Sequence, residues 1–229
     1  MIPMKKLIYS IFVLSICVLG LNAQSKNLED FSYLSTNGDV KVTLRKGNPR
    51  AEYRIINGNA DGLTIEIRGS ELVVKTESNY KFWKKDRTKA EVTVYYNHLS
   101  GIDCSAGSRV IADETIAAER FEVESSSGSS CTVPVEAGDL KADVSSGGKI
   151  TLSGKSQSAA FDASSGGNIE ADELITSVSD AEVSSGASID LFVTKELKAN
   201  ASSGGSIRYR GNPTRTDLNS SVAGSIKSY

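Results

Sequence analysis

The sequence predicts an all-β protein, a single-stranded right-handed parallel β-helix with coils of about 19 residues. Two observations carry this prediction: a serine-glycine signature that recurs at nearly constant spacing, and strict alternation of apolar and polar residues around it. A fixed period of this size is typical of arrays in which each unit packs on its neighbours. The signatures begin at Ser126, Ser145, Ser164, Ser184 and Ser202, with weaker copies at Ser105 and Ser221.

Apolar residues occupy odd offsets from the signature glycine, and polar residues occupy most even offsets. Such alternation predicts strands with one buried face. The same residue type recurs at the same offset in each unit, which in-register parallel coils require and an array of antiparallel hairpins does not. The glycine spacings of 21, 19, 19, 20, 18 and 19 are not multiples of six, which favours a right-handed coil over a left-handed hexapeptide helix. The position three residues after the glycine holds Val110, Cys131, Ile150, Ile169, Ile189, Ile207 and Ile226.

Each unit is predicted to contain two strands joined by a tight Ser-Ser-Gly-Gly turn, with a looser second turn such as Ser153-Gly154-Lys155-Ser156. We place the regular repeats at residues 101–229. Residues 28–100 also alternate but lack the signature, and we expect irregular coils there that cap one end.

Residues 1–23 have the pattern of a signal peptide, so the β-helix domain is expected to span residues 24–229. Lys5 and Lys6 precede an apolar run, and Ala23 provides a small residue for cleavage. Cys17 raises the alternative of a lipid anchor, although Ile16 stands where such signals need a small residue; an uncleaved anchor is the other alternative. The expected location is the periplasm, the cell surface or the extracellular space, with no span after signal removal.

The formal net charge of −2 gives no electrostatic field that would favour binding of nucleic acid.

Cys104 and Cys131 fall in two different inward columns one coil apart. We expect buried thiols that act as small apolar residues, with a disulfide as the alternative.

Acidic residues recur four positions before the signature glycine, on the predicted outward face. In-register stacking spaces them about 4.8 Å apart, where two unit charges repel by roughly 3 kcal/mol at an effective dielectric near 20. Neutralisation by Lys141, Lys149 and Lys198 is one expectation, screening by solvent is another, and a calcium ion bridging adjacent coils is the third. No other cofactor is expected. The candidate calcium ladder is Asp103, Glu124, Asp143, Asp162 and Glu182.

The serines two positions before the glycine are expected to satisfy turn backbone groups, or alternatively to present hydroxyls to a glycan. His98 lies outside the repeats and is expected in an exposed loop, so it supplies no base for a nucleophilic serine. A uniform acidic ladder also lacks the unlike pair of carboxylates that glycosidases use. The sequence therefore predicts no catalytic residues. The basic run from Lys81 to Arg87 contains Trp83 and is a second candidate for surface binding, or else a solvated loop.

The chain resembles the family of exported bacterial proteins described as putative auto-transporter adhesins with a head GIN domain. The resemblance is carried by the Ser-Ser-Gly-Gly-Xaa-Ile units, by Phe31 followed by Asn37-Gly38-Asp39-Val40, and by Phe82-Trp83-Lys84-Lys85. It covers residues 28–229 and implies a β-helix with a role in adhesion and no assigned catalytic residues. A departure at Cys131 leaves the fold expectation unchanged.

We therefore expect a non-enzymatic protein of the cell envelope that adheres to a surface, with a glycan or an envelope protein as its partner. The alternatives are a structural or accessory envelope protein without its own ligand, and a polysaccharide-processing β-helix enzyme.

Overall fold

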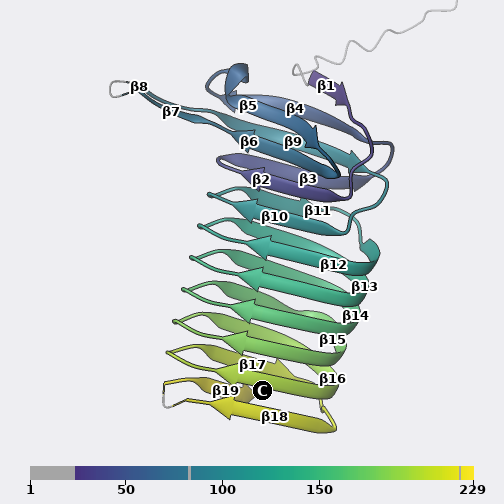
Figure 1. Cartoon of the computed structure of the whole chain (residues 1–229), viewed down its shortest axis with the longest axis vertical. Helices are drawn as coiled ribbons and strands as arrows, with labels where there is room; N and C mark the ends of the chain where they lie inside the picture. The colour runs from purple at the N-terminus through teal and green to yellow at the C-terminus, as the bar shows by residue number, and fades with distance from the viewer. Residues whose placement is uncertain (1–23, 82–83, 222) are drawn as a thin grey trace, which may run out of the picture.

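The computed structural model describes residues 24–81, 84–221 and 223–229. They form a β-solenoid of about seven turns, with coils stacked along the long axis of the molecule (Figure 1). The single helical segment among the described residues is the 3-10 turn η1 (Ala60–Gly62). The strands before the repeats are β1 (Gln24–Asn27), β2 (Tyr33–Asn37), β3 (Val40–Lys46), β4 (Arg50–Asn57), β5 (Leu63–Arg68), β6 (Glu71–Thr76), β7 (Ser78–Lys81), β8 (Lys84–Arg87) and β9 (Lys89–Tyr96).

The remaining strands build the regular coils. They are β10 (Gly101–Ser105), β11 (Arg109–Ala112), β12 (Ile116–Ser125), β13 (Ser130–Val144), β14 (Lys149–Ala163), β15 (Asn168–Val183), β16 (Ser188–Ala201), β17 (Ser206–Arg210), β18 (Arg215–Ser220) and β19 (Ser225–Ser228).

Parallel, in-register pairing of successive coils is confirmed throughout the repeats. Ile150 pairs with Ile169, which pairs in turn with Ile189 of the next coil. All three side chains are fully buried. The lumen is therefore a column of stacked apolar side chains, as the odd offsets in the sequence predict.

The expected looser second turn separates β11 from β12 and β17 from β18, but in β13, β14, β15 and β16 it is not a break in the strand. β14 runs without interruption through residues 153–156, and Ser153 to Ser156 pair with Pro134 to Ala137 of the preceding coil. Gly154 turns this corner with a φ of 106°. The ladder hydrogen bonds point along the solenoid axis, so the chain bends within the plane of its coil without losing its partners. At residues 153–156 the strand therefore only bends, where the sequence predicts a turn.

The tight turns are type I′ turns. In the unit at Ser145, Ser146 and Gly147 have φ values of 50° and 71°, and the Gly148 N–H donates to the Ser145 carbonyl at 2.8 Å. The Gly147 N–H then donates to the Ser165 carbonyl in the next coil at 3.2 Å. The same backbone bond starts from Gly128, Gly166 and Gly186, and the stacked turns form one edge of the solenoid, at the left in Figure 1.

Hydroxyl groups replace apolar side chains in the lumen of the first repeats. The Ser125 and Ser129 hydroxyls lie 2.8 Å apart, and Ser129 also donates to the Cys104 carbonyl at 2.7 Å. All three residues are buried, so this local network satisfies polar atoms that would otherwise lie unpaired in the core. In the following coils glycine or alanine takes the place of Ser129.

The coil stack continues into the region before the repeats. β2 and β3 pair in parallel with β10 and β11, and β6 and β9 add a further parallel layer beyond them. β4 and β5 then pair antiparallel with β9 and β6, and β1 pairs antiparallel with β4. Parallel stacking thus gives way to antiparallel strands at this end, which cover the first layer of the lumen (Figure 1).

The Ile169→Ala substitution tests the stacked core. It leaves a cavity between Ile150 and Ile189, and we expect a loss of about 2–5 kcal/mol in the free energy of unfolding. Asn168→Ala, one residue earlier on the outward face, is the matched control and is expected to change stability by less than about 0.5 kcal/mol. Chemical denaturation followed by circular dichroism measures both values. Equal losses in the two variants would contradict the assignment of the faces.

Two adjacent glycines allow two constraints at the turn to be tested separately, namely the backbone conformation and the close packing between coils. Gly147 has a positive φ and open space around it, so Gly147→Ala is expected to cost about 1 kcal/mol through backbone strain. A Cβ at Gly148 would lie 2.4 Å from the Ser125 carbonyl oxygen of the neighbouring coil. Gly148→Ala is therefore expected to lower the melting temperature more than Gly147→Ala. The reverse order would show that the coils are not packed this closely at the turn.

Candidate functional site

Five carboxylates stand directly over one another on the face that precedes the tight turns. We call Asp103, Glu124, Asp143, Asp162 and Glu182 the acidic file. Each is paired with the next by strand register, from β10 through β12, β13 and β14 to β15. The same column continues as Asn200 and Asn219. The alternation of the strands turns these side chains outward while their immediate neighbours line the lumen.

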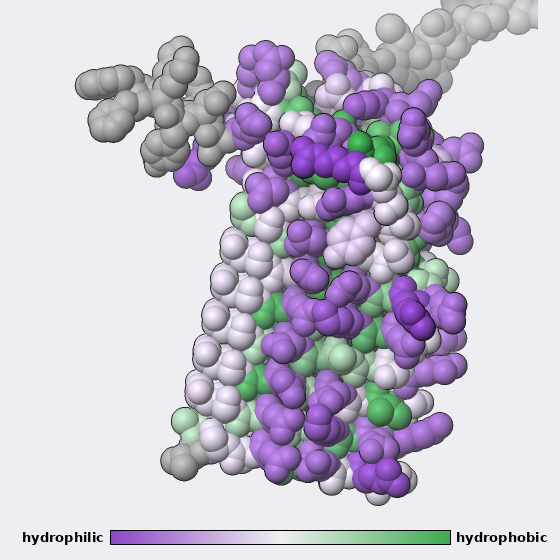
Figure 2. All heavy atoms as spheres, in the orientation of Figure 1, coloured by the Kyte–Doolittle hydropathy of each residue, from purple (hydrophilic) through white to green (hydrophobic). Residues whose placement is uncertain are grey.

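A groove follows the acidic file beside the serines of the tight turns. One hollow of about 160 Å³ extends from Asp103 to Ser164, and a second of about 480 Å³ extends from Asp162 to Ser221. Asp162 lines both hollows, so they lie next to each other along the file. Figure 2 shows this face, with polar side chains running down the coils and the pale edge of serine and glycine turns beside them. The serines that line the groove are Ser125, Ser126, Ser145, Ser164, Ser184, Ser202, Ser220 and Ser221.

Lysine neutralises only one member of the acidic file. The Lys141 ammonium lies 2.7 Å from Asp143 and 2.8 Å from Glu122. The other two expected lysines point elsewhere: Lys149 pairs with Glu170 and Lys198 with Asp180. Neither of these two carboxylates belongs to the file, so the expectation is right for Lys141 and wrong for Lys149 and Lys198. Among the described residues, no basic side chain forms an ion pair with the rest of the file.

Burial and neighbouring carboxylates make the charged state of three members of the file unfavourable. Loss of hydration raises the pKa of Asp103, and the negative charge of Glu71 raises it further. A hydrogen bond from Ser35 acts in the opposite direction and lowers this pKa. Loss of hydration raises the pKa of Glu124 as well, followed by repulsion from Glu122, Asp103 and Asp143. The pKa of Asp162 is raised for the same two reasons. The file therefore favours a proton, or a positively charged group, at its surface.

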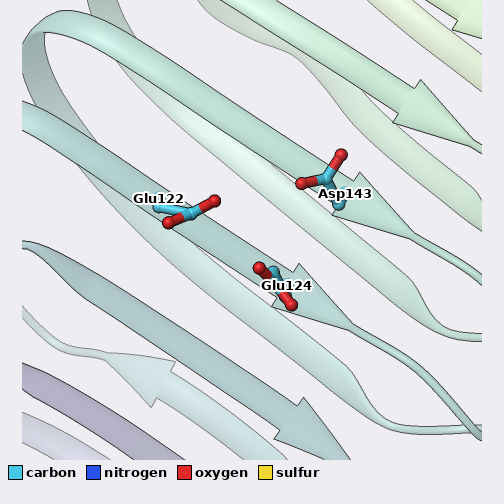
Figure 3. A group of neighbouring side chains, drawn as sticks. All are labelled: Glu122, Glu124 and Asp143. Atoms are coloured by element: carbon cyan, nitrogen blue, oxygen red, sulfur yellow. The ribbon is translucent and has the colours of Figure 1, made fainter. Parts of the chain in front are cut away.

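Glu122, Glu124 and Asp143 come closest to a cation site. One carboxylate oxygen from each lies within 4.8 Å of the others. Figure 3 shows Glu122 and Glu124 on one strand, β12, and Asp143 on its neighbour β13. Oxygen ligands of this type suit calcium, but the Lys141 ammonium already contacts two of the three side chains. The expected calcium ladder stays a prediction, and Glu122 is a member that the sequence analysis missed because it lies two residues outside the aligned column.

An aromatic ring lies beside the first member of the file, in the adjacent column. Tyr33 pairs with Gly101 in the column beside the acidic residues, and its ring lies over the glycine: a Cβ at Gly101 would fall 2.1 Å from the ring carbon Cε2. Tyr33 is partly exposed. Burial raises its pKa, and the charges of Glu124, Glu122, Asp103 and Glu71 raise it further. Sequence analysis missed this residue because Tyr33 lies 68 positions before its partner.

The other candidates lie apart from the groove. His98 is in an exposed loop, as expected. Cys104 and Cys131 are buried free thiols, and a hydrogen bond with Cys104 together with burial raises the pKa of the Cys131 thiol. In the basic run, Phe82 and Trp83 lie outside the described residues, as do the side chains of residues 78–86. The predicted leader, residues 1–23, also lies outside them.

Glu124→Gln tests the electrostatics of the file. The folded-state pKa of Glu124 is raised above its ordinary value of 4.5. Its protonated form therefore stabilises the fold below about pH 4.5, and this contribution is lost as the pH rises through the raised pKa. Glu124→Gln should raise the melting temperature at pH 7, and the gain should vanish at pH 4. Glu173→Gln, an exposed carboxylate outside the groove, controls for net charge. A gain that persists undiminished at pH 4 would contradict the assignment.

Comparison with solved structures shows the same fold elsewhere. A putative adhesin from Bacteroides fragilis superposes with a TM-score of 0.78 at 20% identity, covering 90% of this chain and 96% of that one. Putative adhesins from Parabacteroides distasonis and Parabacteroides merdae give TM-scores of 0.70 and 0.69 at 18% and 17% identity. They cover 90% of this chain, and 96% and 95% of their own chains, respectively. No functionally curated protein matches the chain.

The described residues contain no helix with the length and apolar character of a membrane span.

The family model described as "Putative auto-transporter adhesin, head GIN domain" matches residues 30–213. This match extends over most of the chain and includes both the irregular strands and the repeats. The chain belongs to this head GIN domain family of adhesin-like proteins.

Proposed function

We propose that the protein is a non-enzymatic binding module of the bacterial cell envelope, exported by its leader, that adheres to glycans through the groove beside the acidic file. The family description and the names of the structural neighbours support a role in adhesion. The partner and the face that contacts it are our inference from the geometry.

The observation that carries the proposal is the pair of adjacent hollows that follows the acidic file. Carboxylate and serine groups recur along it at the spacing of the coils, about 4.8 Å. Carboxylates accept hydrogen bonds, and serine hydroxyls both donate and accept them. A polymer with hydroxyl groups at regular intervals matches this pattern over several coils, because each coil offers the same set of partners. Many weak contacts in series then add up to useful affinity.

Adhesion through this groove needs no chemical step. A glycosidase requires two carboxylates in unlike environments, one protonated and one charged. Asp103, Glu124 and Asp162 all have pKa values displaced in the same direction by the same two causes, burial and neighbouring carboxylates. Apart from Asp143, which pairs with Lys141, the groove is thus organised as a repeated contact surface.

A glycan array probed with the purified chain tests the proposal. We expect saturable binding to a subset of glycans, and loss of most of that binding when Asp162 and Glu182 are both changed to Asn and Gln at the centre of the groove. Glu173→Gln is the matched control and should bind like the wild type. Incubation of bound glycans with the protein should release no shorter products. Absence of binding to every glycan, or product release, would contradict the proposal.

A further inference from the structure

The face around Tyr33 combines an aromatic surface with an excess of negative charge. The strand column that contains Tyr33 carries Glu71 on one side and Gly101, then Glu122, on the other. Glycine at position 101 leaves the space in which the ring lies, since any Cβ there would overlap it. The ring is therefore held along the surface of the sheet, where the side chains of other coils project outward.

Hydrogen-bonding groups lie on the strands next to Tyr33. Asp103 is next to it on β10, and Ser35 donates to the Asp103 carboxylate at 3.5 Å. Glu122 and Glu124 follow on the next coil, and the groove begins at Asp103. Lys141 is the one basic residue that forms ion pairs with this cluster among the described residues. The patch thus has an aromatic platform, hydroxyls, and more carboxylates than cations.

We propose that Tyr33 is the platform on which a cationic amino-sugar polymer enters the groove, with its sugar ring stacked on the tyrosine and its ammonium groups on the flanking carboxylates. The inference rests on the proposed glycan-binding function and names the class of glycan. A cation near the face of an aromatic ring is attracted by the ring quadrupole. The carboxylates strengthen that attraction, and serine hydroxyls along the groove hydrogen-bond the sugar hydroxyls.

The charge of the patch excludes the opposite class of glycan. A polyuronide would bring carboxylates against Asp103, Glu122 and Glu124, where like charges at close range are strongly unfavourable. A lysine-rich peptide matches the charge but leaves the serine hydroxyls of the groove without partners. An amino sugar satisfies all three parts of the surface, namely the ring, the acids and the hydroxyls.

Isothermal titration with a fully deacetylated glucosamine hexamer tests the proposal at a pH where its amines are protonated. The comparison ligands are the N-acetylated hexamer, a polyuronide hexamer and a lysine hexamer. We expect the deacetylated sugar to bind at least tenfold more tightly than each of the others. Tyr33→Ala should weaken binding about tenfold, whereas Tyr33→Phe, which keeps the ring, should stay within about twofold of the wild type.

Further variants serve as controls for the effect of charge and for correct folding. Glu124→Gln should weaken binding of the deacetylated sugar, while Glu173→Gln should leave it unchanged. Melting curves for every variant show whether the fold is kept, and Glu124→Gln decides the matter even if Tyr33→Ala proves unstable. Added salt should weaken binding, because the contact is partly ionic.

The outcomes separate this inference from the proposed function. Tighter binding of the lysine hexamer, of the polyuronide or of the N-acetylated sugar would overturn the amino-sugar assignment. Binding of neutral glycans on the array without binding of the deacetylated hexamer would leave the proposed function standing and refute the inference alone. Equal affinity of the wild type and Tyr33→Ala, with both folded, would remove Tyr33 from the site.

Discussion

Hydrogen bonding along the solenoid axis is the constraint on which the rest of the structure depends. The strands of each coil bond to the coils before and after it, so successive coils must keep the same path and the same register. Residues at equivalent positions then share one environment, whether in the lumen, at the turn or on the outer face. The stacked isoleucines and the turn-to-turn bond from Gly147 to Ser165 both follow from this rule. A substitution in one coil therefore also alters the packing of the two adjacent coils, because each coil packs directly on both of them.

The same rule places like charges over one another on the outer face. A protein selected for stability alone would avoid a column of carboxylates, since each pair repels and each loses hydration. Here one member of the acidic file, Asp143, has a lysine partner, and the pKa values of three others are raised. The unfavourable electrostatics are thus built into the coil stack. Such strain is common at binding surfaces, where the ligand supplies the missing partner.

The repeat period made the fold, the inward columns and the acidic file predictable, because in-register stacking converts sequence spacing into spatial neighbourhood. Predictions from the sequence were wrong where the repeat spacing does not determine which residues are neighbours. The corner at Gly154 was predicted as a turn because glycine and serine mark turns, yet axial hydrogen bonding lets the strand continue through it. Lys149 and Lys198 were assigned to the file, although their long side chains reach Glu170 and Asp180 instead. Tyr33 lies outside the repeats, and no period relates it to Gly101.

A perfectly regular ladder would bind a polymer without fixing where it begins, because each coil would be equivalent to the next. Two features break that equivalence in this molecule. Lys141 bridges Glu122 and Asp143 and divides the acidic file into segments of different charge. Tyr33 supplies an aromatic ring in the column on the other side of the file, next to its first member. In the proposed contact, repetition would provide the length and these irregular residues the register, so the departures from the repeat are where specificity is expected to lie.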